Sequence, residues 1–184
     1  MIKVIAGSRR SLPLKTLDGD DITKPTRNMI RETLFNCLQM DVPGSRFLDL
    51  FSGCGAIGIE ALSRGAESAV LVEANKAALE VIKYNVHFTK FDDEADIVRA
   101  DAVSYLRKMN TVDFDIIHLD PPYMKGFERA CVEALNTKEF SNPDAVIVIE
   151  CEKNTDFDFI ENTKFRIYKT KIYSINKHIF LCLK

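Results

Sequence analysis

The sequence predicts an α/β protein built on a mostly parallel, doubly wound sheet. Two observations lead to this fold class: from residue 46 onward five short apolar runs alternate with helical patterns, and the connections between them are short. Apolar runs of this length are typical of strands buried on both faces. With 184 residues, 46% of them hydrophobic, the chain is long enough to bury a core without disulfides or metals.

Local pattern and capping residues define the elements of this part. Gly65 can end a helix over 57–65 in the left-handed conformation, and Asn75 can cap the start of a helix over 75–88. The polar stretches 88–95 and 152–163 are expected to be solvated loops. The expected strands are 46–51, 69–73, 96–100, 114–120 and 145–151, and the two other expected helices are 101–109 and 127–136.

The C-terminal segment predicts an antiparallel hairpin. Apolar and basic residues alternate over 164–173, a second apolar run covers 177–183, and no helix fits between them. Together with the five parallel strands, this hairpin gives a seven-stranded sheet with an antiparallel C-terminal edge.

The first 45 residues predict an extension to the α/β domain of residues 46–184. Two short apolar segments flank a turn at 7–10 as in a hairpin, residues 17–23 form a connector, and an amphipathic helix covers 24–40. Residues 1–48 carry eight basic and five acidic side chains, although the whole chain has a net charge of −2. A basic extension on an acidic body is a candidate footprint for a polyanion.

The composition excludes several protein classes. No apolar run is long enough to span a membrane, and the charged N-terminus does not match a signal peptide, so we expect a cytoplasmic protein. The five cysteines, none in a C-x-x-C pair, are expected to be free thiols.

His118 is expected to face the core or a helix, and His87 and His178 are expected to lie at the surface or an edge. No ligand spacing predicts a metal site.

A glycine-rich segment follows the first predicted strand. Gly53, Gly55 and Gly58 form a G-x-G-x-x-G pattern, in which the backbone turns tightly and the next helix offers free N–H groups. Glu73 ends the next strand, 20 residues after Gly53, where an acid can accept both hydroxyl hydrogens of a ribose. The segment therefore predicts a site for an adenosine-containing cofactor.

Two aspartates help to distinguish between the possible adenosine-containing cofactors. Asp49, at a strand end, can hold the cationic amine of a methionine tail, and Asp101, after the third strand, can contact an adenine edge. Each aspartate alone is more typical of a helix cap or a surface position. Together with Glu73, they favour S-adenosylmethionine over a nicotinamide dinucleotide.

A second motif, Asp-Pro-Pro-Tyr at 120–123, follows the strand over 114–120. The Asp120 carboxylate and the Pro121 carbonyl can accept the two hydrogens of an exocyclic amine, while Tyr123 stacks on the ring that carries it. The amine is a poor nucleophile because its lone pair is delocalised into the ring. Holding both N–H bonds favours the pyramidal amine and its developing positive charge.

The order of these motifs resembles that of class I S-adenosylmethionine-dependent methyltransferases, which have a Rossmann-like fold. The segment KPTRNMIRETLFN at 24–36 resembles the RPT-x(4)-RE-x-LFN segment of the bacterial small-subunit ribosomal RNA guanine-N2 methyltransferases of the RsmD type. The opening VIAGSRRSLPL is similar to the start of that family. Lys24 replaces the usual Arg, and Tyr123 stands where Phe is often found.

The resemblance implies roles for individual residues. The catalytic set that would hold the target guanine is Asp120, Pro121, Pro122 and Tyr123. The set that would bind S-adenosylmethionine is Asp49, Phe51, Ser52, Gly53, Gly55, Glu73, Ala74, Asp101, Ala102 and Asp120. The set that would meet RNA is Arg9, Arg10, Lys24, Thr26, Arg27 and Arg31. Thr26, Arg27 and Arg31 are also candidates for binding the carboxylate of the cofactor.

The implied activity is methyl transfer to the N2 amine of a guanine in small-subunit (16S) ribosomal RNA. We expect a monomer that acts on RNA within a partly or fully assembled small subunit, without a metal and without a membrane.

Three alternatives remain at this point. N6-adenine and glutamine-N5 methyltransferases also have an (Asn/Asp)-Pro-Pro-Tyr motif like that at 120–123, but they usually carry further domains. An NAD-dependent oxidoreductase could use the glycine loop with Tyr173 and Lys177, a Y-x-x-x-K pair that here straddles the predicted hairpin turn. A non-enzymatic RNA-binding module would leave both motifs unexplained.

Overall fold

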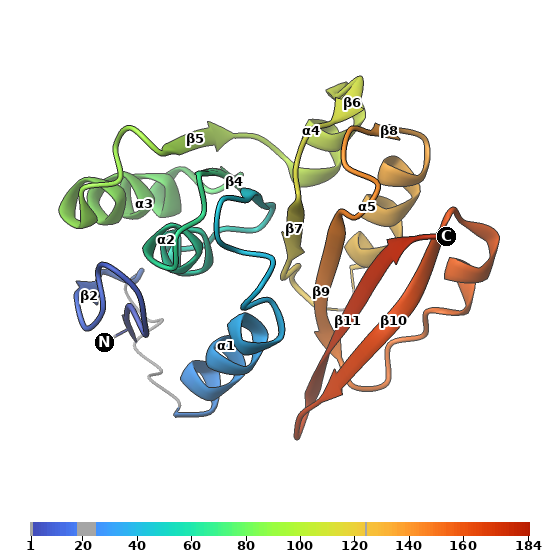
Figure 1. Ribbon diagram of the computed structural model, residues 1–184, viewed down its shortest axis with the longest axis horizontal. Helices are drawn as coiled ribbons and strands as arrows, with labels where there is room; N and C mark the ends of the chain where they lie inside the picture. Colours follow the sequence, from blue (N-terminus) through green and yellow to red (C-terminus); the bar gives the residue numbers. More distant parts are fainter. Residues whose placement is uncertain (1, 18–24, 124) are drawn as a thin grey trace.

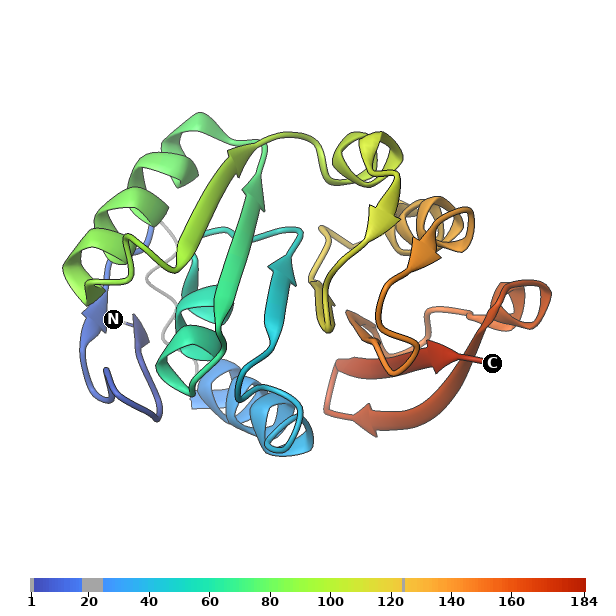
Figure 2. The ribbon, with the colours of Figure 1, turned by 45° about the horizontal axis from the view of Figure 1, so that its top comes forward.

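The computed structural model describes residues 2–17, 25–123 and 125–184, with the backbone alone for residues 25–27. The expected connector and Lys24 lie outside this range. The central sheet has seven strands in the order β10-β11-β9-β7-β3-β4-β5, as Figures 1 and 2 show. Its strands are β3 (Arg46–Asp49), β4 (Ser68–Glu73), β5 (Ala95–Arg99), β7 (Ile116–Leu119), β9 (Val146–Glu152), β10 (Phe165–Ile172) and β11 (Asn176–Leu183).

The strand pairing confirms the predicted sheet. The five strands from β9 to β5 pair in parallel, and β11 pairs antiparallel with both β9 and β10. β10 and β11 therefore form the C-terminal hairpin, at the opposite end of the sheet from β5 (Figure 2).

Helices cover both faces of the sheet. On one face α1 (Pro25–Cys37), α2 (Ala56–Ser63) and α3 (Lys76–Thr89) pack over side chains such as Phe47 and Val148. On the other, α4 (Ala102–Lys108) and α5 (Phe127–Asn136) pack over side chains such as Leu48 and Ile147. Neighbouring residues of one strand thus enter different cores, because side chains alternate across a sheet.

The predicted caps form as expected. The Asn75 side chain accepts hydrogen bonds from the backbone N–H groups of Ala77 and Ala78 at the start of α3. Gly65 has a φ of +99° just after α2, and its N–H donates to the Leu62 carbonyl. All five cysteines are free thiols, as predicted.

The N-terminal hairpin is short: β1 (Ile2–Lys3) pairs with β2 (Pro13–Leu14). Val4 and Leu14 are each 2% exposed and join the same apolar cluster as α1 and α2. The extension therefore adds to the core of the α/β domain instead of forming a core of its own.

Two parts of the fold differ from the expectation. Residues 152–163 are not simply a solvated loop, because they include a 3-10 helix, η1 (Asp158–Asn162), and bury Phe157 and Ile160. Because most residues around Phe157 and Ile160 are polar, the sequence pattern does not indicate that these two side chains are buried. A small pair of strands, β6 (Thr111–Val112) and β8 (Glu139–Phe140), is too short for its pattern to be seen in the sequence.

No helix in the described parts of the chain is both long and apolar enough to cross a membrane.

Candidate active site

The predicted site residues lie where the parallel strands end. Asp49 closes β3, Glu73 closes β4, and Asp120 follows β7. The strand register aligns these ends, since Asp49 pairs with His118 and Leu119 pairs with Ile149. In an open α/β sheet this edge is where ligands bind. The fold therefore brings the two motifs of the sequence, 71 residues apart at Asp49 and Asp120, to neighbouring strands.

The glycine loop has the tight backbone that its sequence predicts. Gly53 and Gly55 have φ values of +55° and +81°, a region that favours glycine. A Cβ at Gly53 would meet no atom within 4 Å, so a ligand can approach the loop there. A Cβ at Gly58 would lie 2.9 Å from the Leu71 Cγ atom. The third glycine thus lets α2 pack closely on β4.

Glu73 holds the loop in place. Its carboxylate accepts the Gly53 N–H at 2.9 Å and the Asn75 N–H at 2.7 Å. Each carboxylate oxygen keeps a lone pair for a further donor. Glu73 therefore links the loop after β3, which contains Gly53, to the loop after β4, which contains Asn75. It also remains available as an acceptor for the hydroxyls of a ribose.

Asp49 is the most deeply buried acid of the predicted site, at 1% exposure. Its Oδ1 atom lies 3.1 Å from Nδ1 of His118, which is also 1% exposed. Its Oδ2 atom is buried and has no hydrogen-bond partner among the described residues. An unpaired buried carboxylate oxygen costs free energy unless a donor binds it. Asp49 therefore fits a cationic amine such as that of a methionine tail.

His118 lies in the core, as predicted, but among charged groups. Burial lowers the pKa of its imidazole, while the bond to Asp49 and the charges of Asp49, Asp120 and Glu150 raise it, and the net shift is upward. The charge of an imidazolium would offset part of the negative charge gathered at this sheet edge.

Other predicted cofactor residues surround the loop. Ser52 is buried and donates its hydroxyl to the Asp49 carbonyl at 2.9 Å. Phe51 packs against Phe127 of α5, with ring centroids 5.6 Å apart. Asp101 caps α4 by accepting the Ser104 N–H at 2.8 Å, the structural role that a lone aspartate suggests, and Ala102 beside it is buried. Ala74 is exposed next to Glu73.

The Asp120 motif forms the second half of the site. Pro121 is buried, whereas Asp120, Pro122 and Tyr123 are exposed. Burial raises the pKa of Tyr123 to about 12, helped by the negative charges of Glu150 and Asp120. Tyr123 therefore keeps its hydroxyl proton at neutral pH and presents an uncharged ring beside the Asp120 carboxylate.

A polar cluster next to this motif was missed by the sequence analysis. Nε2 of His178 lies 3.1 Å from Oε2 of Glu150, and Nδ1 lies 2.9 Å from the Tyr173 hydroxyl. Asn176 donates its side-chain N–H to Oε1 of Glu150, and its own Oδ1 atom is buried and unpaired among the described residues. Burial opposes ionisation of Glu150, but the bond from His178 prevails and lowers the Glu150 pKa.

The prediction that His178 lies at the surface or an edge is wrong, because the side chain is fully buried. β10 covers its strand on the outer side, so an apparent edge strand is internal. The only sequence signal was a polar residue within an apolar run. Tyr173 and Lys177 lie at the hairpin turn as predicted, and not on a helix.

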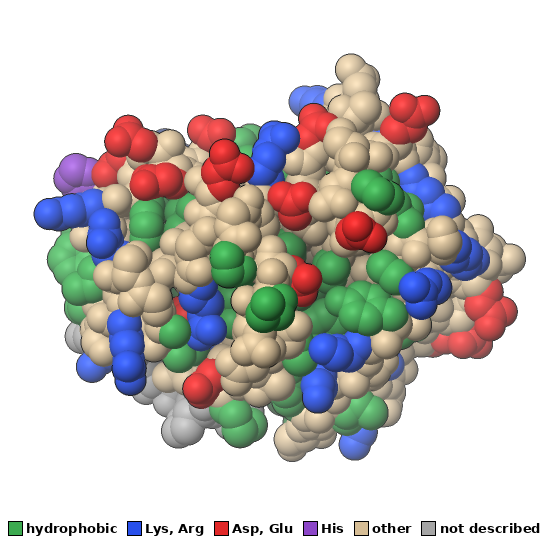
Figure 3. All heavy atoms as spheres, viewed as in Figure 1, with side chains coloured by type: hydrophobic (Ala, Val, Ile, Leu, Met, Phe, Trp, Pro, Cys, Tyr) green, Lys and Arg blue, Asp and Glu red, His purple; other side chains and the backbone are tan. Residues whose placement is uncertain are grey.

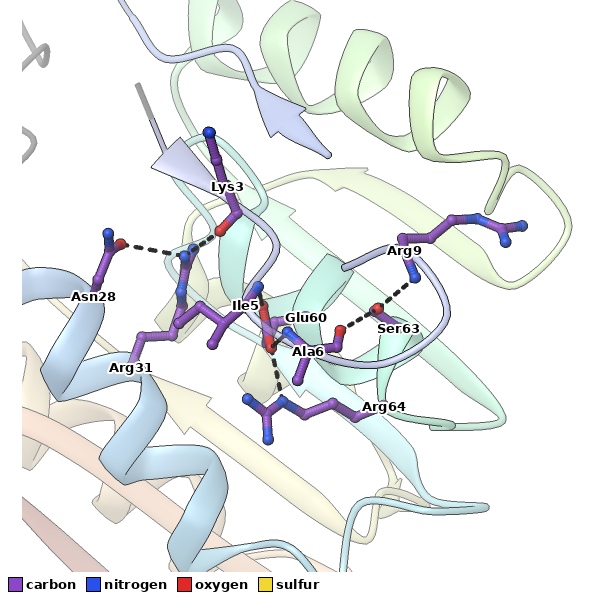
Figure 4. Close-up of polar contacts among 9 residues, drawn as sticks. All are labelled: Lys3, Ile5, Ala6, Arg9, Asn28, Arg31, Glu60, Ser63 and Arg64. Carbon is purple, nitrogen blue, oxygen red and sulfur yellow. Dashed lines mark hydrogen bonds and ion pairs between the residues drawn. The ribbon is translucent and has the colours of Figure 1, made fainter. Parts of the chain in front are cut away.

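Two of the residues predicted to meet RNA, Arg9 and Arg31, make contacts within the fold around the N-terminal hairpin, as Figure 4 shows for part of the network. Arg31 is 6% exposed and donates to the Lys3 carbonyl, so it does not lie on the surface expected to face RNA. Arg9 donates its Nε–H to the Thr89 carbonyl at 2.6 Å and stacks on Phe91. Arg31 thus satisfies a backbone carbonyl of the short hairpin, and Arg9 satisfies one at the C-terminal end of α3. Arg10 is exposed, and the side chains of Thr26 and Arg27 lie outside the described atoms.

This combination of a mixed seven-stranded sheet, a glycine loop after its first central strand and a strand-end Asp-Pro-Pro-Tyr motif defines a class I methyltransferase. A structure described as a candidate methyltransferase from Escherichia coli superposes with a TM-score of 0.83 at 28% identity, covering 100% of this chain and 98% of the other. Catalysis in this class depends on S-adenosylmethionine.

The chain belongs to the family described as Conserved hypothetical protein 95, whose family model matches residues 2–182. A relative from Buchnera aphidicola, named ribosomal RNA small subunit methyltransferase D, is 34% identical over 86% of this chain and 82% of its own length. The Escherichia coli protein of the same name is 33% identical over 82% of this chain and 75% of its own length.

Proposed function

We propose that this protein transfers a methyl group from S-adenosylmethionine to the N2 amine of a guanine in small-subunit ribosomal RNA. The observation that carries the proposal is the meeting of the two motifs at one sheet edge, where Asp49 ends β3 and Asp120 follows the adjacent β7. Two relatives named for methylation of small-subunit ribosomal RNA support the substrate class.

The cofactor end of the site would be formed by the loops after β3, β4 and β5. When bound, S-adenosylmethionine supplies a methyl group on a positively charged sulfur. The unpaired Oδ2 of Asp49 would accept the ammonium of its methionine tail, and Glu73 would accept the ribose hydroxyls. Asp101, exposed at the start of α4, would face the adenine. The open space above Gly53 supports this orientation.

The guanine would lie over Tyr123. The Asp120 carboxylate and the Pro121 carbonyl would accept the two hydrogens of the N2 amine and so orient its lone pair toward the methyl group. These acceptors also favour the positive charge that develops on nitrogen during transfer, which is electrostatic stabilisation without a covalent intermediate on the protein. Because Tyr123 stays uncharged, its ring can stack on the base without repelling nearby phosphates.

RNA would approach from the side of the N-terminal hairpin and α1. Arg10 is the exposed candidate there, and Lys24, Thr26 and Arg27 remain candidates outside the described side chains. We propose a cytoplasmic monomer whose substrate is RNA in a partly or fully assembled small subunit, since few exposed cations of the extension are available to hold naked RNA.

Transfer of labelled methyl groups tests this function. The acceptors are small-subunit particles, stripped ribosomal RNA, duplex DNA and a protein extract, and digested nucleosides identify the product. Label in N2-methylguanosine is expected. Label in N6-methyladenine or in protein would overturn the substrate while leaving the fold and the cofactor site unchanged.

A further inference from the structure

The C-terminal hairpin is the most basic segment of this chain. Residues 164–184 contain six Lys or Arg side chains and no Asp or Glu, in a protein whose net charge is −2. Figure 3 shows Lys and Arg gathered among hydrophobic side chains over the region that β10 and β11 occupy in Figure 1. The charge asymmetry noted at the N-terminus therefore has a second and more concentrated counterpart.

Three of these cations share one face of the sheet. Arg166 pairs with Cys182, Lys169 with Phe180 and Lys171 with His178, and all three partners alternate along β11 on the same face. The spacing from 166 to 169 is odd, so a regular strand would point these two side chains to opposite faces. A register shift between Ile167 and Lys169 inserts an extra residue and aligns them.

This face is continuous with the active site. Lys171 lies opposite His178, His178 lies opposite Glu150, and Glu150 is on the strand next to β7, which leads into Asp120. Three strand spacings separate β10 from β7, which corresponds to about 14 Å. A nucleotide that flanks a base bound at Tyr123 can reach Lys171 over that distance. Lys169 and Arg166 lie two and five residues further along β10 and would contact nucleotides beyond it.

The three side chains are available to a ligand. Arg166 and Lys171 are exposed, and Lys169 is partly exposed with its Nζ 5.6 Å from the centre of the Phe180 ring. None of them takes part in an ion pair among the residues that the structure describes. By contrast, Lys177 donates to the Thr155 carbonyl and is held within the fold.

Exposed apolar side chains lie beside the cations along β10 and at the tip of the hairpin. Tyr168, the extra residue of the bulge, is 41% exposed, and Ile172 and Ile175 at the hairpin tip are 62% and 72% exposed. A basic surface interleaved with aromatic and apolar side chains is typical of nucleic-acid binding, because phosphates pair with the cations while bases and sugars contact the rest.

We propose that Arg166, Lys169 and Lys171, here named the β10 basic face, bind RNA phosphates that flank the target base. This inference rests on the proposed function and adds an RNA-binding surface outside the N-terminal extension. The face would hold the backbone while the Asp120 motif holds the base, so its contacts position the RNA without reading its sequence.

The test compares two triple variants that change the charge equally. One carries Arg166→Gln, Lys169→Gln and Lys171→Gln. The control carries Arg107→Gln, Lys108→Gln and Arg129→Gln, three exposed cations of α4 and α5 on the opposite face. Binding of stripped small-subunit ribosomal RNA is measured at several salt concentrations. Thermal unfolding and S-adenosylmethionine binding are measured on the same samples.

The first variant is expected to reduce the slope of log affinity against log salt by about two to three, which corresponds to three lost phosphate contacts. The control is expected to keep the slope of the parent protein. An unchanged slope in the first variant, or an equal loss in both, would overturn the proposal. Since Lys169 packs on Phe180, a double variant without Lys169→Gln keeps the test valid if the triple variant unfolds.

Methyl transfer by the parent protein separates this inference from the proposed function. Labelled N2-methylguanosine with no effect of the β10 variants would overturn only the RNA surface. A reduced salt slope with no methylated guanosine would support the surface and overturn the proposed reaction.

Discussion

Gly7 lies so close to Ser63 that a Cβ on Gly7 would be 1.7 Å from the Ser63 carbonyl oxygen. The Ser8 N–H donates to this oxygen at 2.7 Å, and the Ser63 hydroxyl donates to the Ala6 carbonyl at 2.6 Å. The turn of the N-terminal hairpin thus rests directly on the C-terminal end of α2. Only glycine permits this approach.

Gly7→Ala should therefore destabilise the protein more than Gly44→Ala. Both glycines have positive φ, +81° and +76°, but a Cβ at Gly44 would meet no atom within 4 Å. The control should lose about 1 kcal/mol from backbone strain, and Gly7→Ala should lose several times that amount through the added clash. Urea unfolding of both variants gives the comparison. Equal losses would show that the turn can move away from α2 freely.

Glu60→Gln should loosen the same hairpin. The fully buried Glu60 carboxylate accepts the N–H groups of Ile5 and Ala6 at 2.7 and 3.0 Å, and Nε of Arg64 at 2.7 Å (Figure 4). An amide keeps the shape but removes the charge that strengthens these bonds, so a loss of about 2–4 kcal/mol is expected. Hydrogen exchange at Ile5 and Ala6 should accelerate.

The matched control for this experiment is Glu67→Gln, an exposed acid just beyond α2. Its stability should change by less than about 0.5 kcal/mol. Similar effects of the two substitutions would mean that the buried network contributes little to stability.

Asp120→Ala should abolish methyl transfer and leave S-adenosylmethionine binding largely intact. Asp120 is exposed just after β7, whereas most of the cofactor would be held by the Gly53 loop, which follows the neighbouring strand β3. Loss of the acceptor removes both alignment of the amine and stabilisation of its charge, which together contribute about 100-fold or more to a rate. Single-turnover transfer and calorimetric cofactor binding measure the two effects separately. Transfer at the parental rate would refute the assigned role.

His118→Asn should reduce stability in a pH-dependent way. The folded pKa of His118 lies above its unfolded value of 6.5. The stabilisation that depends on its proton is therefore complete below pH 6.5 and is lost as the pH rises through the folded pKa. The difference in free energy of unfolding between parent and variant should shrink as the pH rises from 6.5 through the folded pKa. A difference that grows over this range would contradict protonation of His118 beside Asp49.

The same variant should also weaken S-adenosylmethionine binding. His118 fixes Oδ1 of Asp49 and leaves Oδ2 unpaired, so its loss frees the carboxylate to rotate. His87→Asn is the control, because the His87 side chain is 83% exposed on α3. Cofactor affinity should fall several-fold in the first variant and stay unchanged in the second, since a positioned group binds more tightly than a mobile one.

The sequence by itself determined the sheet, its helices and the two motifs. Parallel strands buried on both faces read as continuous apolar runs, and the glycine spacing, the acid at Glu73 and the Asp120 motif are local patterns. Because parallel strands bring their carboxyl ends to one edge of the sheet, both motifs are expected at that edge. For this reason the predicted fold was confirmed, and the two motifs do lie on adjacent strands.

Only the tertiary structure decided which polar side chains are buried and which cations share a surface. His178 is buried because β10 covers its strand, and Arg31 is buried because the short hairpin leaves the Lys3 carbonyl to be satisfied. One extra residue at Tyr168 brings Arg166 onto the face of Lys169 and Lys171. These outcomes depend on pairing between segments distant in the sequence, and no local period encodes that pairing.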